Sequence, residues 1–131
     1  VSGMDAGQIY ISWPLMGSTY FPDDNNYSNI FKISAFSDPS LVQFMHRNLA
    51  YLILIFYLII AYKVYKEKLA QLYLAINLVG LILFIQILLG ILTLLYGAQI
   101  VLASMHQISS IFLVSFSVYL LFLSTNQRLS N

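Results

Sequence analysis

The sequence predicts an all-α membrane protein in which three transmembrane helices follow an outer loop. Hydrophobic residues make up 60% of the 131 residues, charged residues only 8%, and the mean hydropathy is +0.79. A soluble domain contains about 25% charged residues, so this composition is typical of a membrane protein. Residues 69–127 contain no Asp, Glu, Lys or Arg, which argues against the alternative of an amphipathic soluble bundle.

The first 39 residues are expected to form a polar outer loop, together with the end of a preceding helix. Four aspartates and one lysine give this segment a net charge of −3, and three prolines interrupt it. Such runs of Pro, Asp and Asn favour turns. Its aromatic residues, among them Trp13 and Tyr20, predict either an ordered cover over the membrane helices or a layer among the lipid headgroups.

The three membrane helices are expected at residues 41–62, 71–96 and 100–123, within a transmembrane part that comprises residues 40–131. Asp38 and Pro39 mark the first start, because Asp caps a helix and proline suits its first turn. The 22 residues of the first segment span roughly 33 Å, enough to cross a bilayer. The turn at Gly97 separates the other two helices.

The few charges predict how the helices are oriented. The connector at residues 63–68 has a net charge of +2, and the tail contains Arg128. The positive-inside rule places the connector and the tail on the inner side of the membrane. The acidic loop and the Gly97 turn then lie outside, so the first and third helices run in the same direction.

Two histidines at matching depth give the clearest functional signal. His46 and His106 each lie about two turns inside the outer end of the first and third helices, roughly 9–12 Å below the surface. Ionisable residues inside a membrane indicate function, and two neutral imidazoles facing each other suit a haem iron. Alternatively, each histidine only forms a hydrogen bond to a neighbouring helix.

Polar residues next to the histidines are candidates for binding such a cofactor. Arg47 suits a haem propionate, or it extends to the lipid headgroups. Gln43 and Gln107 each flank a histidine and could orient a propionate or an imidazole, or only satisfy a helix end. Gln86 begins a stripe of small or polar residues on the middle helix, which continues through Gly90, Thr93 and Gly97. Such a stripe suits a cofactor groove or ordinary helix packing.

Composition excludes several other classes of site. The chain has no cysteine, so disulfides, thiolate-bound zinc or haem, iron–sulfur clusters and covalently attached haem are all excluded. No further Asp or Glu lies at the depth of the histidines, which disfavours zinc. A net charge of +1 without a basic patch gives no basis for binding nucleic acid.

Four motifs, in this order along the chain, resemble the second half of the haem A synthase family. They are Met4-Asp5-Ala6-Gly7 with Ile9-Tyr10 and Trp13-Pro14-Leu15-Met16, then Val42-Gln43-Phe44-Met45-His46-Arg47, then Gln86-Ile87-Leu88-Leu89-Gly90-Ile91-Leu92-Thr93, and Met105-His106-Gln107. The resemblance covers nearly the whole chain. It is closest to the mitochondrial and alphaproteobacterial branch, since other branches contain loop cysteines. Val1-Ser2-Gly3-Met4 resembles the last turn of a preceding helix, so the chain is expected to be a fragment.

The resemblance implies an oxidoreductase built from two similar four-helix halves. The family oxidises the C8 methyl group of haem O to the formyl group of haem A, for cytochrome oxidase assembly. His46 and His106 would be the axial ligands of an electron-transferring haem b, so that residues 40–131 form most of a haem-binding four-helix bundle. The substrate haem and an acidic catalytic residue belong to the first half. No catalytic residue is therefore expected in this chain, and the chain alone is expected to be inactive.

Two further functions fit the same residues. One is a bis-histidine electron-transfer subunit of a membrane cytochrome, and the other is a transporter or assembly module whose histidines are structural. The expected partners are the lipid bilayer, haem O through the missing half, and either further copies of the chain or cytochrome oxidase assembly proteins. The expected location is the bacterial inner membrane or the mitochondrial inner membrane.

Overall fold

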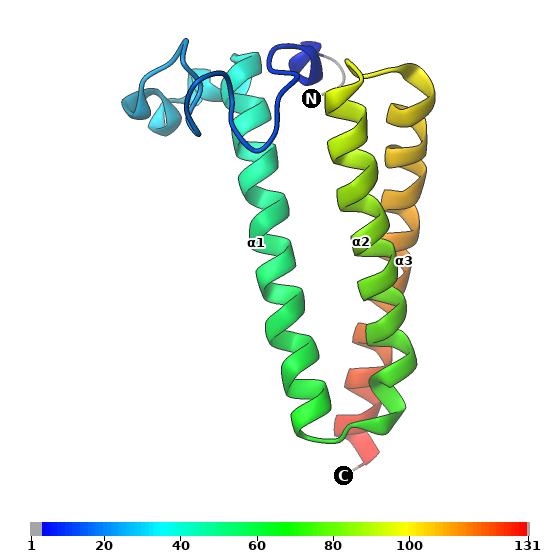
Figure 1. The fold of residues 1–131 in the computed structure, drawn as a ribbon. Coiled ribbons are helices and arrows are strands. Elements are labelled where there is room, and N and C mark those ends of the chain that lie inside the picture. Colours follow the sequence, from blue (N-terminus) through cyan, green and yellow to red (C-terminus); the bar gives the residue numbers. More distant parts are fainter. Residues whose placement is uncertain (1–3, 131) are drawn as a thin grey trace.

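The computed structural model describes residues 4–130, apart from the side chains of residues 127–130. Three long helices follow an outer segment of short 3₁₀ turns, which comprises residues 4–38 (Figure 1). The turns are η2 (Ala6–Gln8), η3 (Tyr27–Phe31), η4 (Ile33–Ser37) and, between the first two long helices, η5 (Ala70–Leu72). The expected end of a preceding helix comprises Val1-Ser2-Gly3-Met4, of which residues 1–3 lie outside the described part, as does the Arg128 side chain.

The long helices are α1 (Pro39–Lys66), α2 (Tyr73–Leu95) and α3 (Ile100–Ser130). Spans long and apolar enough to cross a membrane occur at Pro39–Lys66, Ala70–Leu95 and Ile100–Asn126. The predicted three-helix membrane fold is thus confirmed. The outer segment, the start of α1, the end of α2 and the start of α3 lie at the same end of the molecule (Figure 1).

Asp38 starts α1 as predicted. Its carboxylate accepts hydrogen bonds from the backbone N–H groups of Ser40 and Leu41, both at 3.1 Å. The Asn25 amide, at 3.0 Å, and the Ser40 hydroxyl, at 2.7 Å, also donate to it. These bonds favour the charged carboxylate and lower the pKa of Asp38.

Helix α1 extends to Lys66, four residues beyond the predicted end at Tyr62. It ends because Lys68 adopts a positive φ of 54°, which turns the chain back on itself. The N–H of Leu69 then donates to the Val64 carbonyl at 3.1 Å, and the N–H of Lys68 donates to the Tyr65 carbonyl at 3.2 Å. This is the Schellman arrangement, with lysine at the position that glycine usually takes.

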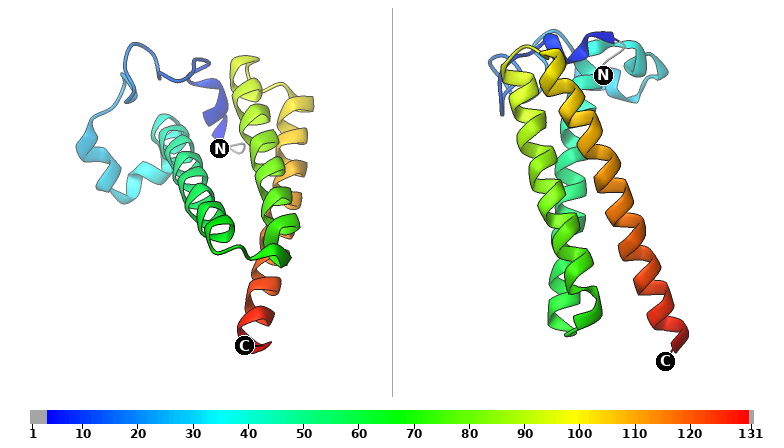
Figure 2. Two further views of the ribbon diagram at one scale, coloured as in Figure 1. Left: turned by 60° about the horizontal axis from the view of Figure 1, so that its bottom comes forward. Right: turned by 90° about the vertical axis from the view of Figure 1, so that its right-hand side faces the viewer.

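The end of α2 has the same arrangement and confirms the predicted break. Gly97 has φ of 66°, a conformation that glycine adopts without a steric penalty. Its N–H donates to the Leu94 carbonyl at 3.1 Å, while the N–H of Ala98 donates to the Thr93 carbonyl at 2.7 Å. The short turn that results brings α3 back antiparallel to α2 (Figures 1 and 2).

The helices do not pack uniformly. Helices α2 and α3 lie side by side, whereas α1 has fewer contacts with α2 (Figures 1 and 2). Close contacts gather toward the inner end, where Val64, Leu72 and Ile76 are buried together. Tyr57 of α1 lies against Gly80 of α2, so closely that a Cβ at Gly80 would collide with its hydroxyl. Toward the outer end, α1 and α2 line a cavity together with α3.

Part of the outer segment packs on that end, while the η3 and η4 turns lie beside α1 on the side away from α2 (Figure 1). Phe21 and Ala35 are buried against Leu41 of α1, with Phe44 packed beside them. The η2 turn contacts both α1 and α2. The η2 turn therefore bridges the two helices at the point where they diverge.

Candidate haem site

A cavity of about 430 Å³ lies between α1, α2 and α3 beneath the outer segment. Its wall is largely apolar and includes polar side chains from α1 and α2 and one, His106, from α3. The residues on which the site depends are Gln43, His46 and Arg47 of α1, Gln86, Gly90 and Thr93 of α2, His106 of α3, and Trp13 of the outer segment. An apolar pocket with a few convergent polar groups is the usual form of a cofactor site.

The two histidines face each other across this cavity. Their ring centres are 6.3 Å apart, and the ring planes are inclined by 79°. An iron–imidazole bond is about 2 Å long and a ring nitrogen lies roughly 1 Å from the ring centre, so two imidazoles on one iron have centres about 6 Å apart. The separation of the His46 and His106 ring centres therefore fits two imidazoles on one iron.

The surroundings of His106 also fit a metal-bound imidazole. Its Nδ1 is buried and has no hydrogen-bond partner. The ring lies against Gly90, where a Cβ would come within 3.1 Å of His106 Cε1. Gln86 Nε2 lies 3.5 Å from His106 Nε2, at the outer limit of a hydrogen bond. Ser109 donates a hydrogen bond to Gln86 Oε1 and thereby orients the amide.

Gln43 and Arg47 lie at the outer mouth of the cavity and bind the outer segment. Gln43 Nε2 donates to the Tyr10 carbonyl at 3.0 Å, and Arg47 Nη2 donates to the same oxygen at 3.1 Å. Arg47 Nη1 donates to the Leu15 carbonyl at 3.2 Å. Gln43 Oε1 and Arg47 Nε are buried without partners. The buried Nε–H of Arg47 is thus free for a further acceptor in the cavity.

Two of the predicted positions do not lie in the cavity wall. Gln107 is exposed, and its carbonyl accepts a hydrogen bond from Ser110, so the structure gives no support for its role at the site. Gly97, the last member of the predicted stripe, forms the turn between α2 and α3. Gln86, Gly90 and Thr93 do line the cavity.

Sequence reasoning did not single out Tyr51, which also lines the cavity. The Trp13 indole N–H donates to the Tyr51 hydroxyl at 3.1 Å. Tyr51 follows Gln43 and Arg47 at four-residue spacing, so all three lie on one face of α1. That spacing could have indicated Tyr51 as a residue of the site. Its hydrogen-bond partner, however, is a loop residue 38 positions away, which the sequence does not reveal.

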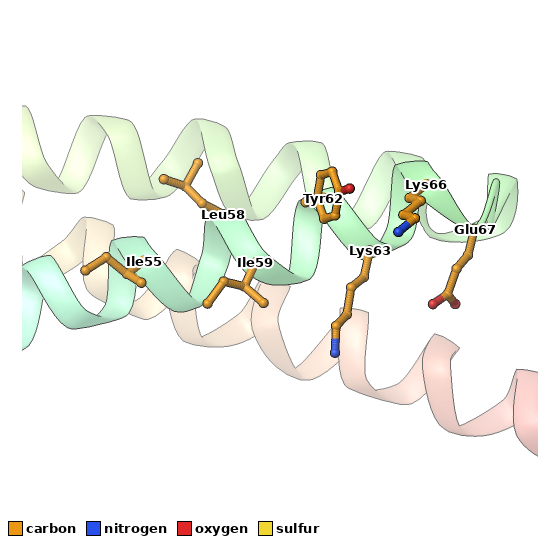
Figure 3. Close-up of a pocket in the computed structure, with 7 residues that line it drawn as sticks. All are labelled: Ile55, Leu58, Ile59, Tyr62, Lys63, Lys66 and Glu67. Carbon is orange, nitrogen blue, oxygen red and sulfur yellow. The ribbon is translucent and has the colours of Figure 1, made fainter.

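A second hollow, of about 600 Å³, lies toward the inner end of α1 (Figure 3). Its lining comes from this one helix and consists of Ile55, Leu58, Ile59, Tyr62, Lys63, Lys66 and Glu67. It contains no histidine. Within residues 4–130, no group of three or more His, Cys, Asp or Glu side chains could hold a metal ion. The facing histidines remain the candidate metal ligands.

The fold and the site together define a class, namely helical membrane proteins with a facing pair of imidazoles in a bundle cavity. Residues 1–118 match the COX15-CtaA family, described as cytochrome oxidase assembly protein, and the chain belongs to this family. The chain is therefore an integral membrane protein.

Curated relatives agree with the resemblance seen in the motifs, and each is named "Heme A synthase". The relative from Pelagibacter ubique (strain HTCC1062) is 40% identical over 126 residues, which cover 96% of this chain and 37% of the relative. The Rickettsia prowazekii (strain Madrid E) relative is 35% identical over 126 residues, which again cover 96% of this chain and 37% of the relative. That of Rickettsia bellii (strain OSU 85-389) is 38% identical over 119 residues, 91% of this chain and 35% of the relative.

The chain thus spans little more than a third of the length of these relatives. No solved structure matches it significantly. The relatives are bacterial, which assigns the chain to the bacterial inner membrane rather than the mitochondrial one.

Proposed function

We propose that this chain is the haem b-binding half of a haem A synthase, with His46 and His106 as the two axial ligands. The observation that carries the proposal is the facing pair of rings, 6.3 Å apart across a cavity. The partnerless Nδ1 of His106 and the space left by Gly90 add support. Family membership makes haem the expected cofactor.

The chain's own residues hold and shield the cofactor in this proposal. His46 of α1 and His106 of α3 would hold it, and Gly90 leaves room for the His106 ring. Gln86, oriented by Ser109, positions His106. When bound, a bis-histidine haem supplies one-electron transfer.

The whole protein's activity is proposed to be oxidation of the C8 methyl group of haem O to a formyl group. Helices α1–α3 contain no Asp or Glu, so this chain does not supply a carboxylate at membrane depth. Haem O would bind in the part of the relatives that lies outside the match. Residues 1–39 would serve as the outer loop and residues 40–131 as the haem-binding half.

A test uses the full-length protein, purified in detergent and supplied with haem O and a reductant. We expect a b-type band in the reduced-minus-oxidised spectrum, together with haem A in the extracted pigments. A b-type band without haem A formation would instead indicate an electron-transfer cytochrome. Absence of any b-type band would contradict the haem proposal and favour a module with structural histidines.

A further inference from the structure

We propose that Gln43 and Arg47 are positioning residues that clamp the cap segment, residues 10–15, over the mouth of the cavity. In this arrangement Trp13 is the lid of the site. The statement that the lid covers haem rests on the proposed function. The clamp itself is inferred only from contacts within the chain.

The clamp consists of two side chains one helical turn apart on the same face of α1. Together they donate three hydrogen bonds to two carbonyl oxygens, those of Tyr10 and Leu15 at the two ends of the cap segment. Gln43 is only 3% exposed, so its amide is committed to this contact. A planar guanidinium donates in two directions from one rigid group, which allows Arg47 to fix both ends at once.

The cap segment reaches the cavity because both of its ends are fixed. Between them, Trp13 lines the cavity and donates to Tyr51 at 3.1 Å. A further contact holds the segment that follows, since the Tyr20 hydroxyl donates to Asn48 Oδ1 at 2.7 Å. The membrane helix α1 thus contains a row of polar side chains that form hydrogen bonds with the outer segment.

This arrangement gives Arg47 a role different from that of a simple propionate partner. Each of its Nη groups donates one N–H to a loop carbonyl, so a cofactor carboxylate would have to share these groups with the loop or use the partnerless Nε–H. A charge partner tolerates lysine, but a clamp does not, because one ammonium cannot reproduce the fork that spans both carbonyls.

The experiment measures hydrogen–deuterium exchange in the full-length protein, with Arg47→Lys and Gln43→Ala as test variants. We expect the peptide that covers residues 9–21 to exchange about ten-fold faster in each variant, because each loses at least one hydrogen bond that holds the cap segment. Peptides from α2 should exchange at the wild-type rate. Lys32→Ala is the matched control, since it removes the other cation of the outer side and should leave the cap unchanged.

A second readout distinguishes the clamp from general loosening of the protein. Gln43→Ala changes no charge, so a lower reduction potential of the b-type haem would report water reaching an uncovered site.

Unchanged exchange of residues 9–21 in both variants would overturn the clamp. If Arg47→Lys does not fold, Gln43→Ala decides alone. A wild-type protein without b-type haem would refute the proposed function, while the exchange data would still test the clamp.

Discussion

Gly90 sets how closely the His106 ring can lie against α2. A Cβ at this position would come within 3.1 Å of His106 Cε1, tighter than ordinary van der Waals contact. Gly90→Ala should therefore displace the imidazole slightly and weaken haem retention, and Gly90→Leu should abolish it by filling the cavity. The measurement is the haem content per protein after purification.

Leu92→Ala is the control for these variants. Leu92 lies two residues further along α2 and is exposed, outside the cavity wall. Its replacement should leave the haem content unchanged. Full haem content in Gly90→Leu would show that the cofactor does not lie beside His106.

Asp38 should make the outer end of α1 sensitive to acid. Hydrogen bonds from Asn25 and Ser40 lower the pKa of its carboxyl, so the charged form stabilises the fold. That contribution is complete above the ordinary pKa of about 3.9 and is lost as pH falls through the lower folded value. Asp38→Ala should cost about 1 kcal/mol of stability near neutral pH through loss of the helix cap.

Thermal unfolding of the full-length protein between pH 3 and pH 6 tests the Asp38 prediction. The wild type should lose stability at the acid end of this range. Asp38→Asn keeps a capping oxygen but not the charge, so its curve should be flatter there. Identical curves for wild type and Asp38→Asn would contradict the role assigned to the charge.

Helices α1 and α2 depend on one close approach for their mutual position. Because a Cβ at Gly80 would collide with the Tyr57 hydroxyl, Gly80→Ala should destabilise the protein by about 1–3 kcal/mol. Tyr57→Phe removes the hydroxyl and should relieve part of that cost. The double variant should then be more stable than the sum of the single effects predicts.

The free energies of unfolding of the wild type, the two single variants and the double variant, measured in detergent, form the double-mutant cycle. Leu81→Ala, at an exposed position next to Gly80, is the control and should lie close to the wild type. Strictly additive effects would mean that Tyr57 and Gly80 do not meet.

The start of α1 and the end of α2 were more predictable from sequence than the end of α1. Asp38 and Gly97 act through local chemistry, a side-chain cap and a left-handed turn, which a sequence displays directly. The end of α1 has no such signal. Lys68 takes the left-handed position there because the chain must turn at that point for Val64, Leu72 and Ile76 to be buried together. Such a turn depends on tertiary packing, which local sequence does not report.

The whole molecule should lie in the membrane with its outer segment on the periplasmic side. The net charge of −3 on residues 1–39 and of +2 on residues 63–68 predicts this orientation. A membrane-impermeant thiol reagent should label Ser28→Cys in intact cells. It should label Glu67→Cys only after the cells are opened, in a full-length protein without other accessible cysteines.

These two positions are matched controls for each other, since both residues are exposed. Labelling of Glu67→Cys in intact cells, with Ser28→Cys protected, would reverse the orientation. It would also move both histidines to the other half of the bilayer.

The proximity of His46 and His106 was predictable from the sequence, but the contacts of the cap segment were not. The charges of the loops predict that the first and third helices run in the same direction. Because His46 and His106 lie equally far from the outer ends of these helices, they are expected at the same level in the membrane. The loop contacts join residues more than 30 positions apart, and no local pattern encodes which carbonyl an arginine will find. Gln107 lies outside the cavity wall for a related reason, because a position next to His106 in sequence lies about 100° around the helix from it.

The central claim is that His46 and His106 share one iron. Electron paramagnetic resonance of the full-length protein measures this most directly, using His46→Ala, His106→Ala and the double variant. We predict that the low-spin signal of this half disappears in either single variant, with no further loss in the double variant, because each imidazole needs the other. A low-spin signal that persists in both single variants would place the haem elsewhere and contradict the account.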